Sequence, residues 1–369
     1  MRTFGLIGVV IWSGIFGFFG SKYRFVHKET ICGKEEYRYN VIFAIIVFLP
    51  VILWAGFRGG AGYVDTNAYI NMYSTIPTSV DGLIGYLKVQ PDDFGFTILM
   101  SIIKVVFGSN YTPFLLIIAI VEGGAVISLY RKFSSHYLTS VFLFIVSTEY
   151  FSWMFNGIRQ FLAVSIIMLA FPFLLEKKYI KYFLLIGLAA TIHMTAIIMI
   201  PLALVVTGKP WNVKTLFMIA IGIFALMMTS MFTDLLSVAT QNTQYSGVID
   251  SWNETGDDGT NPIRVLVYAV PTIFAFFGRK NLESLKNPVV NICVNFSIVS
   301  TVMWLISMVT SGIYMGRLPI YASVYNYILL PYEIDALFSG KVKSIVFVTM
   351  IGMYLFYYYY QLHFIWGVI

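Results

Sequence analysis

The residues best suited to chemistry in this sequence are arginines that lie outside its lysine-rich segments. When the apolar runs are laid across a membrane, 17 of the 24 Lys and Arg residues fall in short connections on one side, and only four of those are Arg. Seven basic residues remain, and five of them are arginines: Arg2, Arg58, Arg159, Arg264 and Arg317. A planar guanidinium binds phosphate or carboxylate through two bonds at once, whereas orienting a membrane protein needs only positive charge. We therefore expect an anion-binding site on the opposite, outward face.

A second set of residues is suited to accepting a proton. His193 lies inside a long apolar run, and an imidazole has a pKa close to ambient pH, as an efficient base requires. Asp65 is the competing base, or a group that orients an acceptor hydroxyl. Both residues also have structural interpretations. A single histidine within an apolar run is usually a hydrogen-bonded packing residue, and Asp65 could form an ion pair with Arg58 that fixes the loop.

The composition identifies the class of protein that positions these residues. Of the 369 residues, 58% are hydrophobic and 11% are charged, and the mean hydropathy is +0.79. Soluble domains contain about a quarter charged residues, so we predict an all-α integral membrane protein. The net charge of +6 follows from lysine-rich cytoplasmic loops and requires no nucleic-acid partner. Cys32 and Cys293 are the only cysteines, so neither a disulfide framework nor a zinc site is indicated.

We expect roughly 10–12 transmembrane helices in a single polytopic domain that covers residues 1–369. A membrane span needs about 20 apolar residues. Ten runs meet this need: residues 3–20, 41–57, 112–130, 138–154, 158–175, 215–236, 263–278, 289–311, 318–338 and 344–361. The lysine-rich connections between them belong in the cytoplasm by the positive-inside rule. The first run resembles a signal peptide but lacks a cleavage pattern, so we interpret it as a retained anchor that follows Arg2.

Two further apolar runs do not fit one span each. Residues 179–207 are too many for one span, yet both ends are lysine-rich and belong inside. We predict a hairpin of shortened helices that turns near His193, which places the imidazole near the outer surface. Residues 94–107 number only 14 and include Lys104, so they are expected to lie in the interface or re-enter rather than cross.

The remaining polar segments, residues 58–93 and 238–262, are predicted to be outward loops. They combine carboxylates with aromatic residues and few cations, a composition that suits polyhydroxylated ligands but also occurs in plain solvated connectors. Tyrosines of these loops are candidates for stacking on sugars, although tyrosines also collect at membrane interfaces regardless of function. We interpret the acid pairs Asp92-Asp93 and Asp257-Asp258 as solvated loop residues rather than as metal ligands.

Three short motifs carry a resemblance to a known family. The first is Phe57-Arg58-Gly59-Gly60 followed by Asp65-Thr66-Asn67-Ala68-Tyr69. The second is Asn156-Gly157-Ile158-Arg159-Gln160 at the start of an apolar helix, and the third is Ile192-His193-Met194-Thr195-Ala196. In this order and spacing, from about residue 41 to 335, the chain resembles the EpsG family of Wzy-like exopolysaccharide and capsular polysaccharide polymerases.

The resemblance implies a fold related to GT-C glycosyltransferases and O-antigen ligases. It also implies a reaction that joins polyprenyl-diphosphate-linked oligosaccharides, a donor and an acceptor, on the outer face of the bacterial cytoplasmic membrane. Membrane lipid is then a partner, and a chain-length regulator is a further candidate. In this reaction Arg159 and Arg317, with Arg58 and Arg264 behind them, would hold the diphosphate. The candidate sugar-binding residues are Gln160, Asn156, Tyr69, Tyr73 and Tyr245.

Two other classes of function remain open from the sequence. A flippase or exporter of the same glycans would use the arginines for headgroup binding and would need no base. A membrane O-acyltransferase would use His193 to activate a sugar hydroxyl, but it should draw its acyl donor from the cytoplasmic side. No Walker motif, dinucleotide-binding glycine loop, paired cysteine ligands or His-Glu-x-x-His pattern occurs, so we expect neither a nucleotide cofactor nor a metal.

Overall fold

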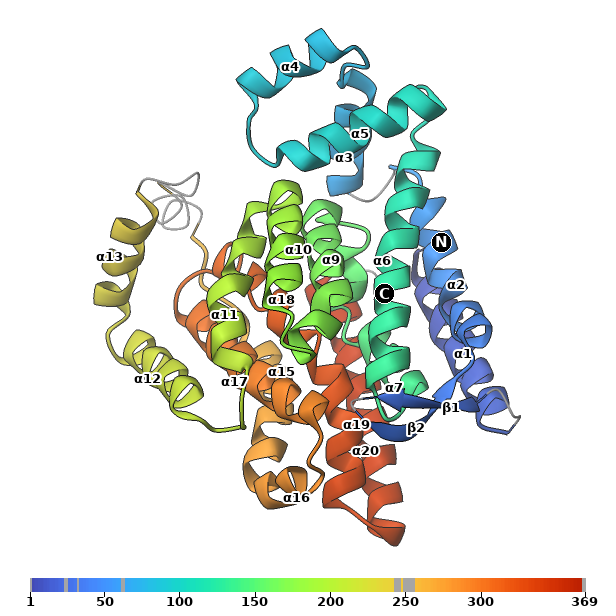
Figure 1. The fold of residues 1–369 in the computed structure, drawn as a ribbon, viewed down its shortest axis with the longest axis vertical. Coiled ribbons are helices and arrows are strands. Elements are labelled where there is room, and N and C mark those ends of the chain that lie inside the picture. The colour runs from blue at the N-terminus through green and yellow to red at the C-terminus, as the bar shows by residue number, and fades with distance from the viewer. Residues whose placement is uncertain are drawn as a thin grey trace. The chain divides into compact units, whose positions relative to one another are not determined.

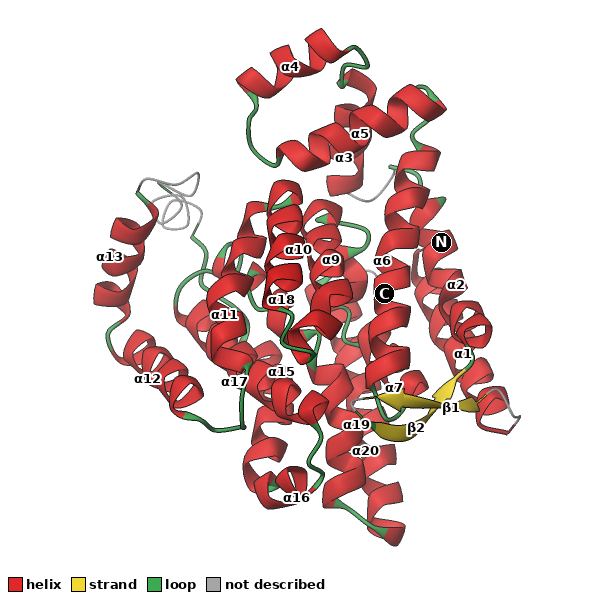
Figure 2. Ribbon diagram, in the orientation of Figure 1, coloured by secondary structure: helices red, strands yellow, loops and turns green. Residues whose placement is uncertain are grey.

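The protein is almost entirely helical, as the sequence predicts for an integral membrane protein. The computed structural model describes residues 2–22, 26–31, 33–60, 64–241, 247 and 256–366. Figure 2 shows helices connected by loops, with a single two-stranded hairpin of β1 and β2 within this part of the chain. Contacts between residues divide the protein into two compact units, Met1–Ile198 with Gly340–Ile369, and Met199–Ser339.

The first unit contains the N-terminal half of the chain and the C-terminal helix. Its elements are α1 (Arg2–Lys22), β1 (Val26–Ile31), β2 (Lys34–Tyr39), α2 (Val41–Gly56), α3 (Val64–Thr75), α4 (Val80–Val89), α5 (Phe94–Phe107), α6 (Thr112–Phe133), α7 (Tyr137–Val146), α8 (Glu149–Trp153), α9 (Ile158–Leu175), α10 (Tyr179–Ile192), η1 (Met194–Ile198), α20 (Gly340–Tyr360) and the π-helical η3 (Gln361–Ile365). Helix α6 packs against α2 and α9, and α9 packs against α10. In Figure 1 the short helices α3, α4 and α5 lie together beyond one end of α6, α9 and α10.

The second unit is built around the long helix α17. Its elements are α11 (Met199–Val206), α12 (Val213–Met227), α13 (Thr229–Thr240), α15 (Pro262–Phe277), α16 (Arg279–Ser284), α17 (Pro288–Val309), η2 (Met315–Arg317), α18 (Ile320–Ser323) and α19 (Asn326–Leu337). Aromatic stacking joins its helices: the ring of Tyr268 lies 4.8 Å from Trp304, and Phe296 lies 4.1 Å from Tyr325. Such offset-stacked pairs add to the stabilisation from burial of the rings.

Several helices begin where an asparagine caps the first turn. The side chain of Asn40 accepts a hydrogen bond from the Ile42 N–H at 2.8 Å, and Asn287 accepts one from the Val289 N–H at 2.9 Å. A cap of this kind satisfies one of the N–H groups that the first turn leaves without a helical partner. Helix α17 also has proline at its first position, where a missing N–H is no disadvantage.

Four helices in the described residues are long and apolar enough to cross a membrane, and a bent pair is a fifth candidate if it counts as one span. The four are Thr112–Phe133, Ile158–Leu175, Pro288–Val309 and Gly340–Ile365. Helices α12 and α13 form the bent pair, with 113° between them at Met228. The predicted single spans 138–154, 215–236 and 318–338 are therefore each divided into shorter helices. The number of crossings stays a prediction.

The prediction that residues 179–207 do not form one helix is confirmed. Helix α10 ends at Ile192, His193 has an extended backbone with φ −153° and ψ 116°, and the chain continues as η1 and α11. The break leaves N–H groups without helical partners, and nearby side chains accept their hydrogen bonds: Asp93 accepts the Met194 N–H and His193 Nδ1 accepts the Thr195 N–H. Irregular backbone among apolar segments requires such partners. The segment 94–107 forms the 14-residue helix α5, which packs against α3, α4, α6 and α10.

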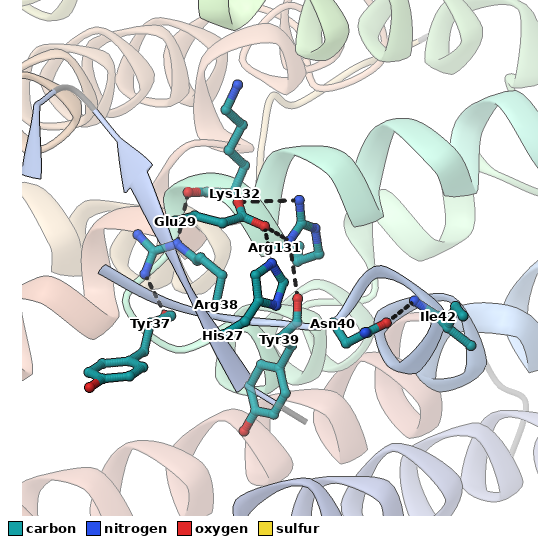
Figure 3. A network of polar contacts seen from close by, with 9 residues as sticks. All are labelled: His27, Glu29, Tyr37, Arg38, Tyr39, Asn40, Ile42, Arg131 and Lys132. Atoms are coloured by element: carbon teal, nitrogen blue, oxygen red, sulfur yellow. Dashed lines mark hydrogen bonds and ion pairs between the residues drawn. The ribbon is translucent and has the colours of Figure 1, made fainter. Parts of the chain in front are cut away.

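The connection 21–40, predicted only as a cytoplasmic loop, contains the β1–β2 hairpin. Figure 3 shows side chains of this hairpin in polar contact with Arg131 and Lys132 at the end of α6. Arg131 Nη1 lies 2.7 Å from Glu29 Oε1 and donates to the Tyr39 carbonyl at 3.1 Å, while Arg38 Nε donates to the Lys132 carbonyl at 2.9 Å. Burial alone would raise the pKa of Glu29, but Arg131 and His27 outweigh it and hold that pKa below its ordinary value.

Candidate functional site

The candidate site in the first unit is organised around the start of α9. Gly157 precedes this helix with φ +67°, a left-handed conformation that side chains with a Cβ rarely adopt. Its N–H donates to the carboxylate of Asp65 at 3.0 Å, which brings the start of α3 to the start of α9. Asp65 therefore satisfies one of the N–H groups at the helix N-terminus, where the helix dipole also favours an anion.

Arg58 is buried beside this helix start and is bonded to the protein. Its Nε donates to Thr66 Oγ1 at 3.0 Å, its Nη1 donates to the Ala55 carbonyl, and its Nη2 lies 3.5 Å from the Phe155 carbonyl. Thr66 Oγ1 in turn donates to the same Phe155 carbonyl at 2.6 Å. Arg58 thus joins α2, α3 and the segment that leads into α9. The residue is only 6% exposed, so a role in holding diphosphate stays a prediction that this geometry does not favour.

Arg159, two residues after Gly157, has a more exposed environment than Arg58. Its Nη1 forms an ion pair with Asp93 Oδ2 at 3.1 Å, and one third of its side chain is exposed. Its Nε is buried and has no hydrogen-bond partner in the described part of the chain. A guanidinium has five N–H donors, so this one retains donors for an anionic ligand.

His193 lies at the break between α10 and η1, close to the same ion pair. Its Nδ1 lies 2.8 Å from Thr195 Oγ1, and the N–H of the next residue, Met194, donates to Asp93 Oδ1 at 3.1 Å. Asp93 therefore contacts both Arg159 and the backbone beside His193. The imidazole is half-buried. The structure thus brings together the helix start with Arg159, the segment with Asp65, and the His193 break.

The predicted sugar-binding residues differ in how accessible they are. Tyr73 is fully buried, its ring stacks on Phe114 at 5.1 Å, and its hydroxyl donates to the Gly108 carbonyl at 2.9 Å, so it is a core residue. Gln160 is also buried, whereas Asn156 and Tyr69 are half-buried near the start of α9 and in α3. Tyr245 lies outside the described residues.

The other two predicted arginines belong to the second unit. The Arg264 guanidinium lies 6.0 Å from the centre of the Trp304 ring, within reach of a cation–π contact. Arg317 is exposed at the end of η2. Because the two units are not placed relative to each other, convergence of these arginines with Arg159 and His193 in one cavity stays a prediction.

The loop that leads to Arg317 is held by Asp257, an acid for which the sequence predicts a solvated position. Asp257 accepts hydrogen bonds from the Ser311 hydroxyl and from the N–H groups of Gly312 at 2.9 Å, Ile313 at 3.0 Å and Gly259 at 3.2 Å. Burial alone would raise the pKa of Asp257, but these donors outweigh it and lower the pKa. Asp257 is therefore half-buried and bonded to residues 311–313, whereas the sequence predicts only a solvated loop acid.

The same correction applies to Asp93. Only 7% of its side chain is exposed, because α5 packs on α10 and covers it. Burial raises the pKa of this carboxyl, an effect that Arg159 and the Met194 N–H reduce and that Asp92 reinforces, with a net rise. The available signal was the position of Asp93 directly before an apolar helix, but nothing in the local sequence distinguishes a buried acid from a solvated helix cap.

Comparison with known proteins identifies the family of the chain. The EpsG family model matches residues 41–366, which include every described helix from α2 onward and all the candidate base, diphosphate-binding and sugar-binding residues. No curated protein and no solved structure matches the chain. The match covers most of the 369 residues and confirms the resemblance predicted from residues 57–69, 156–160 and 192–196. The chain belongs to the EpsG family.

Proposed function

We propose that this protein is a membrane glycosyltransferase that polymerises polyprenyl-diphosphate-linked oligosaccharide repeat units on the outer face of the cytoplasmic membrane. Membership of the EpsG family supports a role of the polysaccharide-polymerase type. The observation that carries the proposal is the position of Arg159. Its partly exposed side chain lies at a helix N-terminus, beside a carboxylate that also contacts the backbone next to His193. The contacts of Asp93 with Arg159 and with the residue after His193 support a shared site in which Arg159 binds the anion and His193 is the base.

The reaction forms one glycosidic bond and breaks one bond to phosphate. The acceptor hydroxyl attacks the anomeric carbon of the donor chain, and the diphosphate leaves with the bonding electron pair. Arg159 stabilises the charge that develops on the leaving diphosphate, and the N-terminus of α9 adds its dipole. Arginines of the second unit, Arg317 and Arg264, are candidates for the same task. The proton of the hydroxyl passes to a base of the protein.

His193 is the preferred base, because Asp65 has another task. Asp65 Oδ2 accepts the Gly157 N–H at 3.0 Å and so fixes the turn before α9. The imidazole of His193 is half-buried, and its Nδ1 lies 2.8 Å from Thr195 Oγ1, a contact that orients the ring. General-base catalysis contributes on the order of 10²–10⁴-fold. Loss of His193 should therefore lower turnover more than substrate binding.

A lipid-linked repeat unit supplied alone to purified protein in detergent tests the proposal. Glycans of increasing length should form, whereas an exporter would return the substrate unchanged, and that result would refute a polymerase. Arg159→Ala should lower the yield by at least about 100-fold, the typical cost of losing a donor to a developing charge. Arg159→Lys keeps the positive charge but loses the planar guanidinium that binds an oxyanion through two bonds, so its activity should lie between those of Arg159→Ala and the wild type. The matched control is Arg279→Ala, since Arg279 is an exposed arginine at the start of α16.

A further inference from the structure

Asp93 occupies an unusual position for an acid in a polar connecting segment. It precedes helix α5 with φ +51°, a left-handed backbone that a residue with a Cβ adopts at some cost. Its side chain is only 7% exposed, while its neighbour Asp92 is exposed to solvent. Asp92 and Asp93 thus offer two carboxylates one residue apart, one on the surface and one enclosed.

The enclosed carboxylate connects three elements that are distant in the sequence. One oxygen pairs with Arg159 at the start of α9, and the other accepts the N–H of Met194 at 3.1 Å, directly after α10. Helix α5 lies very close to α10: a Cβ on Gly95 would be 2.2 Å from Thr191 Oγ1. The backbone that carries Asp93 is therefore held against α10, and Asp93 has little freedom to move away from either partner.

We infer that Asp93 is a positioning residue that fixes Arg159 relative to the turn containing His193. The role follows from the two bonds, because each carboxylate oxygen holds one of the two groups. A charged partner orients a guanidinium more strictly than a neutral one, since the hydrogen bonds are stronger and directional. Placing a reacting group about 1 Å from its productive position costs on the order of 100-fold in rate.

This inference rests on the proposed function for its consequence in catalysis, but not for its structural content. The bond between Met194 and Asp93 exists whether or not the protein polymerises glycans. Hydrogen–deuterium exchange at the Met194 amide therefore reports on the positioning role alone. Polymer length and yield report on the proposed function.

The experiment compares Asp93→Ala, Asp93→Asn and the matched control Asp92→Asn in the purified full-length protein. Asp93→Ala removes both bonds and should speed exchange at Met194 by about tenfold or more, as loss of a typical hydrogen bond implies. Asp93→Asn keeps an acceptor oxygen and should leave that exchange nearly unchanged, so it also serves if the alanine variant does not fold. Asp92→Asn removes an equal charge one residue away and should change neither exchange nor activity.

A double-mutant cycle with Arg159 decides whether Asp93 acts through that residue. In the wild-type background Asp93→Ala should lower polymer yield by about 100-fold. In an Arg159→Ala background the same change should cost clearly less than about 100-fold, because one of the two groups that Asp93 holds is already absent. Equal losses in both backgrounds would overturn the inference, as would unchanged Met194 exchange in Asp93→Ala. Absence of polymer from the wild-type protein would refute the proposed function and leave the exchange result to decide the positioning role.

Discussion

Substitution of Gly157 by alanine should displace the start of α9 and with it Arg159. Gly157 has φ +67°, and a Cβ at this position would lie 2.2 Å from Cε3 and 2.3 Å from Cζ3 of Trp153. The indole has little room to move, because its Nε1 donates to Glu149 Oε1 at 3.1 Å. The left-handed backbone costs a non-glycine residue roughly 1–2 kcal/mol, and overpacking typically adds about 1–3 kcal/mol. The total strain is therefore about 2–5 kcal/mol.

That strain is relieved most easily by movement of the segment between Trp153 and Ile158. Such movement weakens the bond between the Gly157 N–H and Asp65, and it shifts Arg159 two residues further on. A shift of about 1 Å at a group that contacts the reacting atoms lowers the rate on the order of 100-fold. We therefore expect Gly157→Ala to lower both the thermal unfolding temperature in detergent and the yield of polymer.

The control is Gly124→Ala in α6, because a Cβ there meets nothing within 4 Å and the position is exposed. Alanine within a helix is favoured over glycine by roughly 0.5–1 kcal/mol, so this variant should be slightly more stable and fully active. Combining Gly157→Ala with Trp153→Ala should remove the overpacking share of the strain but not the backbone share. Wild-type stability and activity in Gly157→Ala would refute the reasoning, because neither the backbone nor the indole would then constrain this turn.

Two further substitutions separate structural roles from ligand binding. Arg58→Lys removes the fork that bonds Thr66 and two carbonyls, and should destabilise the protein by about 2–4 kcal/mol in thermal unfolding while the folded fraction keeps its affinity for prenyl diphosphate. A stable Arg58→Lys protein with strongly weakened affinity would instead assign Arg58 to the ligand. Asp257→Asn should lower the unfolding temperature near neutral pH. The pKa of Asp257 in the folded protein lies below its ordinary value of 3.8, so the extra stability of the wild-type protein is complete above about pH 4 and is lost as the pH falls further. An advantage that persisted unchanged well below that range would contradict the role of the carboxylate.

The sequence predicted those parts of the fold that depend on local composition. The span expected at residues 158–175 coincides with helix α9, and the break expected near His193 lies where α10 ends. Both predictions rest on the length of apolar runs and on where charges interrupt them, which the membrane constrains strongly. The β1–β2 hairpin has a weaker local signal, because its two six-residue strands are rich in charged residues and resemble a solvated cytoplasmic connection.

Other features could not be predicted because they depend on contacts between distant segments. Asp93 is enclosed only because α5 packs on α10, and Asp257 is bonded only because residues 311–313 return to it. A polar pair of acids looks the same in a sequence whether solvent or protein surrounds it. The division of residues 138–154 at Thr148, where φ is +62°, likewise interrupts a run that is apolar enough for one helix.

The contrast between Arg58 and Arg159 shows how the structure refines an argument based on residue type. Both are arginines in segments that are predicted to face outward, and the sequence predicts a diphosphate-binding role for both. Arg58 is 6% exposed and directs all three of its nitrogens to protein oxygens, which is how a buried cation is stabilised. Arg159 pairs one nitrogen with Asp93, leaves Nε without a partner among the described residues, and exposes a third of its side chain. A ligand competes only for donors that the fold has not used, so Arg159 is the stronger candidate for binding an anion. Arg58 instead holds together α2, α3 and the segment that leads into α9.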